Sequence, residues 1–303
     1  MKITREICHR ILRSIKRAGQ YGLTRQLKSR RIKRDFKAIH GYPLNLKAPR
    51  SLSEKINWIK LYRNLKPLAP FVDKYTVRGF VADRIGKEYL IPLVGLFHRF
   101  DDINIDRLPG AFVLKATHGS GWNIIVKDKK AVDWRATGRI VDEWLHSDYA
   151  LISGEENYCN INGRIMIEDY LQDAAGRLDD LKFYCCNGEP LGLHVDIDRF
   201  VNHGYRIYDA HWNEFVKTKP PEKDLPQIPR PDNLKELLEI CRKLSAGFSF
   251  VRVDLYNVDG RIYFGELTFT PGSGMSSFDP VESDYYFGEP LDVRRYIGKL
   301  QRL

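Results

Sequence analysis

The sequence lacks any hydrophobic run long enough to cross a membrane. A spanning helix needs about 20 apolar residues, whereas the longest uncharged apolar run, Leu90–Phe97, has eight. The N-terminus has neither an apolar core nor a small-residue cleavage site, so we expect no secretion signal. Cysteine is scarce, since there are only five, with no Cys-x-x-Cys pair. This pattern argues against a disulfide framework or a zinc ribbon and favours a reducing cytoplasm.

Net positive charge is also lacking over most of the chain, although the net charge of the whole is +10. Residues 1–37 hold 13 Lys and Arg against Glu6 and Asp35, a net of +11, so the rest of the chain sums to −1. No aromatic interleaving or known motif accompanies the basic residues, and we therefore expect no nucleic-acid partner. Hydrophobic residues make up 43% of the 303 positions, which is enough for a core and excludes a disordered chain.

The basic residues belong to an arm that we assign to residues 1–48. Ile3, Ile7, Ile11 and Ile15 recur every four residues, which predicts an amphipathic helix. Two interpretations are open. The arm, through residues 1–37, makes a peripheral contact with the inner membrane surface or with a glycosyltransferase; alternatively, the Ile stripe packs on the body and the charges face water.

Beyond the arm, helices and hairpins are mixed without regular βαβ alternation, which favours an α+β fold over a doubly wound sheet. The patterns predict helices from a cap at Ser51 or Ser53, after Asp73-Lys74 to about residue 85, and over 134–145 and 234–246. They predict strands over 90–96, 111–116, 124–127, 164–168, 181–186 and 190–196, and a final hairpin over 251–267.

The final hairpin carries the most informative polar residues. A three-residue loop, Val258–Gly260, would pair Asp254 with Phe264 and Arg252 with Glu266. The side chains of Arg252, Asp254, Glu266 and Thr268 would then share one face, whereas an even-numbered loop would put Asp254 and Glu266 on opposite faces. Two carboxylates beside an arginine suit a Mg²⁺ platform. The alternative is a solvent-facing side held by an Arg–Glu pair.

Two further segments have weaker signals. Lys115 ends a predicted strand before the small loop His118–Gly121, whose backbone N–H groups could approach phosphates; many hairpin tips are equally rich in glycine. In Ile165–Leu171 an apolar strand runs into acidic residues, which would suit adenine recognition by Glu168 or an ordinary strand end.

In this order, the segments resemble the ATP-grasp superfamily, and more closely the TupA-like ATP-grasp proteins of teichuronopeptide and capsular polysaccharide biosynthesis. The most specific strings are K-A-T-H-G-S-G-W-N, D-L-K-F-Y-C-C-N-G and G-E-L-T-F-T-P-G-S-G, and the resemblance runs from about Ser51 to Pro290. It implies an ATP-grasp fold, with two α+β lobes that sandwich ATP. We expect an N-terminal part at 49–110, a small nucleotide-lid lobe at 111–167 and a large lobe with the metal site at 168–303.

The resemblance also implies roles for individual residues. Arg252 would be catalytic, stabilising charge on the acylphosphate, and Asp254, Glu266 and Thr268 would bind Mg²⁺. ATP would contact Lys74, Lys115, His118, Gly119, Ser120, Gly121, Trp122, Glu168, Asp169, Tyr170, Leu171 and Lys182, and the acceptor would contact Arg199, Pro271, Gly272, Ser273 and Gly274. The superfamily commonly has Asn at the position of Thr268, so occupancy by two metals is in doubt.

The implied activity is that of an ATP- and Mg²⁺-dependent carboxylate–amine ligase that releases ADP. It would attach an amino acid or amine to a uronic acid of a cell-surface polysaccharide (capsule, O-antigen or teichuronopeptide), presented as a small or lipid-linked saccharide. Two alternatives are a glycosyltransferase of the same pathway, for which Asp196-Ile-Asp198 would be the metal motif, and a non-catalytic ATP-binding scaffold.

Overall fold

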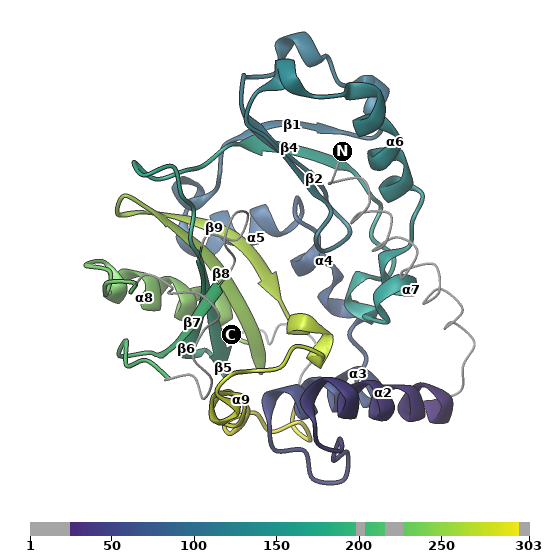
Figure 1. Cartoon of the computed structure of the whole chain (residues 1–303), viewed down its shortest axis with the longest axis vertical. Coiled ribbons are helices and arrows are strands. Elements are labelled where there is room, and N and C mark those ends of the chain that lie inside the picture. The colour runs from purple at the N-terminus through teal and green to yellow at the C-terminus, as the bar shows by residue number, and fades with distance from the viewer. Residues whose placement is uncertain (1–24, 198–203, 216–226, 297–303) are drawn as a thin grey trace.

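Two antiparallel sheets form two lobes of the chain (Figure 1). The structure is a computed structural model that describes residues 25–197, 204–215 and 227–296. The helices are α2 (Arg25–His40), α3 (Leu52–Tyr62), α4 (Ala69–Val72), α5 (Val77–Ile85), α6 (Trp134–Leu145), α7 (Tyr149–Ser153), α8 (Leu234–Ser245) and α9 (Val281–Gly288). Short 3₁₀ helices are η1 (Lys66–Leu68), η2 (Lys87–Tyr89), η3 (Phe100–Asp102), η4 (Ile105–Arg107), η5 (Lys129–Ala131), η6 (Glu156–Tyr158) and η7 (Pro271–Gly274). The strands are β1 (Leu93–Phe97), β2 (Phe112–Ala116), β3 (Asn123–Val126), β4 (Ile165–Asp169), β5 (Asp180–Cys186), β6 (Glu189–Ile197), β7 (Gly204–Asp209), β8 (Phe250–Val258) and β9 (Arg261–Thr268).

The small lobe is built on the sheet β1-β4-β2-β3, the upper sheet in Figure 1. Helix α6 packs beside it, and Phe112, Leu114 and Val141 are among the buried residues of its own hydrophobic core. Strand β1 pairs with β4, so this sheet draws strands from both sides of the expected boundary at residue 110.

The large lobe is built on the sheet β7-β6-β5-β8-β9, with α8 packed against β5, β6 and β8. Side chains alternate along a strand, and β5 uses both faces. Cys185 contacts Cys241 of α8, whereas Lys182 and Tyr184 line a cleft on the other side. All seven residues of β5 are buried, which explains why this strand is apolar or charge-paired at every position.

Helices α2, α3 and α9 form the base of the molecule in Figure 1. Ser51 caps α3, and its capping box with Glu54 matches the predicted helix start. An Asp284 carboxylate on α9 accepts a 2.8 Å bond from the Ser53 backbone N–H, which joins the two helices.

Helix α2 is the described part of the basic arm, and it lies against the body. Phe36 on α2 is 0% exposed, and α2 contacts α3. The isoleucine stripe of residues 3–15 lies outside the described residues, so both interpretations of that stripe stay predictions. Across the described ranges, no helix has the length and apolar character of a bilayer-spanning segment.

Candidate active site

The β8–β9 hairpin has a different register from the predicted one. Its loop is a two-residue turn, in which Asp259 has φ 50° and Gly260 φ 86°, and Val258 pairs with Arg261. Two positive φ values define the turn type that matches the twist of paired strands. The predicted three-residue loop, and the pairings derived from it, are therefore wrong.

A β-bulge in β9 returns the four polar side chains to one face of the hairpin, as predicted. Leu255 pairs with Phe264 but Asp254 pairs with Glu266, so Gly265 is the extra residue on β9. A Cβ on Gly265 would lie 3.0 Å from the Asp254 carbonyl oxygen, which explains the absence of a side chain there. The even-numbered turn alone would separate the two carboxylates, and the bulge brings them back together.

The four polar side chains on this face form one network. Arg252 donates to both Asp254 oxygens, at 2.7 and 2.6 Å. It also donates to Glu266 at 3.3 Å and to the Thr268 hydroxyl at 3.2 Å, and that hydroxyl donates to Glu266 at 3.1 Å. Burial raises the pKa of Asp254 to about 7, against the opposing effect of Arg252. Asp254 therefore binds a proton far more readily than an exposed aspartate does.

Lys182 extends this polar surface onto β5 and β6. Its ammonium group donates to Asp180 at 2.8 Å and also to Asp196. His194 Nε2 lies 3.2 Å from the other Asp196 oxygen. The predicted acceptor ligand Arg199 lies outside the described residues.

In the small lobe, Lys115 and Glu168 contact each other. Lys115 donates to one Glu168 oxygen at 2.7 Å, and Arg78 donates to the other at 2.6 Å. Asp169, Tyr170 and Leu171 follow at the half-buried end of β4. Arg78 was not predicted as a site residue, because it belongs to no recognised motif; it lies on α5.

Lys74 lies between the two lobes. Its ammonium group donates to the Gly119 carbonyl at 2.6 Å and lies 3.7 Å from Glu266. Its backbone N–H donates to the Thr117 carbonyl at 3.1 Å. Desolvation lowers the pKa of Lys74, although Glu266 opposes this effect. This lysine connects the small-lobe loop to the hairpin of the large lobe.

The residues of the glycine loop face different ways. The His118 side chain is buried, with Nε2 2.9 Å from the Trp144 carbonyl and its ring 5.0 Å from the Trp122 ring. Ser120 is exposed and lines the cleft. Gly121 has φ 74°, which favours glycine. His118 and Trp122 thus anchor the loop to the small lobe, and its tip faces the cleft.

A second loop, Pro271–Gly274, closes the opposite end of the hairpin. Gly272, Ser273 and Gly274 all have positive φ. A Cβ on Gly274 would lie 2.6 Å from the Asn57 amide nitrogen. The Lys60 ammonium donates to the Ser273 carbonyl at 3.0 Å and to the Ser273 hydroxyl. Lys60 is another residue that no motif identified.

These parts border a cleft of about 960 Å³. Of the predicted site residues it brings together Ser120, Lys182, Arg252, Glu266, Thr268 and the loop Pro271–Gly274. Lys115 and Glu168 are not in its lining and form the separate small-lobe cluster described above. Residues that the sequence analysis missed complete the walls, among them Lys28, Arg31 and Arg34 on α2 and Glu155 and Tyr158 near α7.

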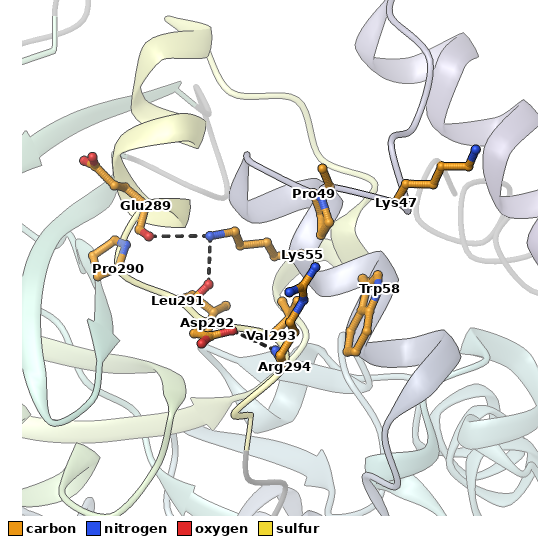
Figure 2. A pocket seen from close by; sticks show the side chains of 11 residues that line it. Lys47, Pro49, Lys55, Trp58, Glu289, Pro290, Leu291, Asp292, Val293 and Arg294 are labelled. Carbon is orange, nitrogen blue, oxygen red and sulfur yellow. Dashed lines mark hydrogen bonds between the residues drawn. The ribbon is translucent and has the colours of Figure 1, made fainter.

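A smaller pocket of about 320 Å³ lies between α3 and the segment after α9 (Figure 2). Its central lysine, Lys55, donates to the carbonyls of Gly288 and Leu291, both at 2.7 Å. These bonds fasten the C-terminal segment to α3. We assign this pocket a structural role.

The chain is similar to one protein family and to several ligases of known structure. The family model of the TupA-like ATP-grasp proteins matches residues 54–292, and no curated protein matches the chain. The L-amino acid ligase from Bacillus licheniformis is 15% identical with a TM-score of 0.50, over 84% of this chain and 57% of that one. The D-alanine–D-alanine ligase from Bacillus anthracis, solved with ATP, is 18% identical with a TM-score of 0.42, over 74% and 63%.

This chain thus spans less than two thirds of the length of either ligase. At such identities, the likeness to the L-amino acid ligase concerns the fold, and it agrees with the predicted pair of α+β lobes. The match of the family model covers well over half of the chain. The chain belongs to the TupA-like ATP-grasp family.

Proposed function

We propose that this protein is an ATP- and Mg²⁺-dependent ligase that joins a carboxylate to an amine and releases ADP and phosphate. Its acceptor would be a uronic acid of a cell-surface polysaccharide. The observation that carries the proposal is the shared face of Arg252, Asp254, Glu266 and Thr268, which borders a cleft also lined by Lys182.

The proposed reaction has two steps. A carboxylate oxygen of the acceptor attacks the γ-phosphorus of ATP, the bond to the ADP oxygen breaks, and an acylphosphate forms. An amine then attacks the acyl carbon, and phosphate leaves. In such reactions the protein mainly positions the reactants and stabilises negative charge. We assign phosphate contacts to Lys74, Lys115 and Lys182, and charge stabilisation at the acyl group to Arg252.

The donor set of the hairpin fits Mg²⁺. Asp254 and Glu266 offer only oxygen ligands, and Mg²⁺ typically uses one or two carboxylates together with substrate phosphates. In the chain as described, no three His, Cys, Asp or Glu side chains gather into a complete metal site, which suits an ion that relies on phosphates. Thr268 donates its hydroxyl to Glu266, so we assign it the orientation of that carboxylate. When bound, Mg²⁺ would neutralise charge on the phosphates.

The cations of α2 that line the cleft support an acidic acceptor. Lys28, Arg31 and Arg34 of α2 line the cleft at helical spacing. Asp35 on the same face pairs with Arg31 at 3.4 Å and with Arg34 at 2.8 Å. Arg31 and Arg34 share the single carboxylate of Asp35, and we propose that this side of α2 attracts a saccharide that carries carboxylates or phosphates.

The ligase explains the cleft better than a glycosyltransferase does. In the glycosyltransferase reading, Asp196 would coordinate a metal with Asp198. Its carboxylate instead accepts a bond from the buried Lys182 ammonium, and Asp198 lies outside the described residues. That reading also leaves Lys74 and the Ser120 loop without a role.

The test is turnover of ATP by the purified protein with Mg²⁺, oligomers of glucuronic or galacturonic acid, and the twenty amino acids tested one at a time. We expect release of ADP and phosphate and a new amide detected by mass spectrometry. Release of AMP would contradict the proposal. ATP binding without turnover would favour the scaffold, and thermal protection by UDP-sugars but not by ATP would favour a glycosyltransferase.

We also propose that residues 1–37 hold the protein at the inner membrane face, close to lipid-linked saccharides. The support is the net charge of +11 in this segment, since anionic lipids attract basic segments. Deletion of residues 1–24 would leave α2 in place and should lower recovery with anionic vesicles but spare ATP turnover. Residues 1–24 hold six Lys and Arg against Glu6, and equal recovery with and without them would refute a membrane contact through this segment.

A further inference from the structure

Glu155 is a buried carboxylate in the wall of the cleft that no step above uses. It lies between α7 and η6 and is 6% exposed. The Thr270 hydroxyl donates to one of its oxygens. Thr270 immediately precedes the Pro271–Gly274 loop, so Glu155 adjoins the end of the cleft where we place the acceptor carboxylate.

The groups around Glu155 connect it to the catalytic hairpin. Its carboxylate interacts electrostatically with Lys60 and with Glu266. Tyr158, one turn further along, interacts with Glu155, with Glu266 and with Arg252. All five side chains line the same cleft. Glu155 thus borders the same cleft as the hairpin residues and lies within electrostatic reach of Glu266.

Burial raises the pKa of Glu155, and Lys60 opposes the rise only in part. The Lys60 ammonium also donates to the carbonyl and hydroxyl of Ser273, so Glu155 is not its only partner. A cation that enters the cleft would stabilise the ionised form of this buried carboxylate. The raised pKa also makes the carboxylate a stronger base.

We propose that Glu155 binds the ammonium group of the amine substrate and acts as its general base. This inference rests on the proposed ligase function. The ligand class is a primary amine that is protonated in solution, held between Glu155 on one wall and the acylphosphate above Arg252 on the other.

Amide formation removes two protons from the nitrogen of the ammonium group, and Glu155 takes the first. The Glu155 carboxylate takes one proton from the ammonium group, which frees the nitrogen lone pair. That pair attacks the acyl carbon and forms the C–N bond. The bond from the acyl carbon to the phosphate oxygen then breaks with its electrons on phosphate, and phosphate takes the second proton from nitrogen. Glu155 finally returns its proton to solvent.

Hydroxylamine separates this step from phosphoryl transfer, because it is uncharged near neutral pH and needs no base to become a nucleophile. It converts an acylphosphate into a hydroxamate, which is measured by its colour with Fe³⁺. The experiment compares hydroxamate and amide formation by the full-length protein and by Glu155→Gln. Glutamine keeps the size of the side chain and can still accept the bond from Thr270. Glu143→Gln, at an exposed position on α6, is the matched control.

We expect Glu155→Gln to lose amide formation about 100-fold, and to keep hydroxamate formation and its melting temperature near the wild-type values. Glu155→Asp should recover part of the amide activity. Equal loss of both products, or no loss of amide, would overturn the role of Glu155. No hydroxamate from the wild-type protein with any uronate oligomer would overturn the proposed function itself and this inference with it.

Discussion

The sheets of the two lobes carry charged clusters of opposite composition. The small-lobe carboxylate of Glu168 pairs with two cations, Lys115 of β2 and Arg78 of α5, a helix that packs against α8. In the large lobe, the single guanidinium of Arg252 lies between the carboxylates of Asp254 and Glu266. One cluster has an excess of positive charge and the other an excess of negative charge.

From this difference we propose different tasks for the two lobes. The small lobe can bind phosphate oxygens directly through its own side chains. The large lobe would repel a phosphate unless a cation came between, which is the physical reason to expect Mg²⁺ there. Lys74 lies 2.6 Å from the Gly119 carbonyl of one lobe and 3.7 Å from Glu266 of the other. We propose that it contacts a phosphate when ATP binds.

The largest effect should come from Glu266→Gln, which removes one of the two carboxylates and with it the excess negative charge of the large-lobe cluster. Metal-dependent turnover should fall by about 10²–10³-fold, the usual cost of losing one electrostatic contact at a reacting centre. ADP release at saturating ATP and Mg²⁺ measures it. Glu282→Gln, at an exposed position on α9, should leave turnover unchanged. Full activity of Glu266→Gln would remove Glu266 from the metal site.

Lys115→Met tests the positive cluster in the small lobe. Arg78 would remain bonded to Glu168, so the fold should persist, and the loss should appear as weaker ATP binding. A charge-assisted bond contributes about 1.5–3 kcal/mol, which predicts a KM for ATP raised roughly 10- to 100-fold. Lys127→Met, at an exposed position just after β3, is the control. A fall in kcat with unchanged KM would place Lys115 at the reacting group instead.

Sequence patterns predicted the strands that carry both clusters, but not the register in which β8 pairs with β9. Observed strand bounds differ from the predicted ones by one residue at most places, because alternation of apolar side chains is a local signal. The hairpin register is not local. Val258-Asp259-Gly260 suits a two- or a three-residue loop, and the bulge at Gly265 depends on the opposing Asp254 backbone.

The same distinction explains which site residues were missed. Lys115, Glu168 and Glu266 belong to strings that resemble the family. Arg78, Lys60 and Glu155 come from segments without a motif, and only the packing of α3, α5 and the α7–η6 segment brings them to the site. Their identification required the three-dimensional arrangement.

Dependence on pH should differ between the two clusters. Burial raises the pKa of Asp254 to about 7, so this carboxylate gains a proton and loses its negative charge as the pH falls through 7. At subsaturating Mg²⁺, turnover should be about tenfold lower at pH 6 than at pH 8. Saturating Mg²⁺ should move the acid limb to lower pH, since the ion favours the ionised form. The Lys115→Met variant should keep the same midpoint, and a shifted midpoint would mean that the clusters titrate together.

The smallest effect should come from α2, whose Lys28, Arg31 and Arg34 line the cleft. Arg31→Gln removes one cation that lines the cleft, whereas Lys33→Gln removes the same charge from an exposed position that does not line it. Arg31 is 33% exposed and shares its charge with Asp35, and solvent screens such pairs to about 0.5–1 kcal/mol. We therefore expect the KM for a uronate oligomer to rise roughly two- to fivefold in Arg31→Gln, with the KM for ATP unchanged. The difference between the two variants should shrink as salt is raised. If Lys33→Gln raised the acceptor KM equally, the effect would come from the overall charge of the helix, and the cleft wall would have no specific part in acceptor binding.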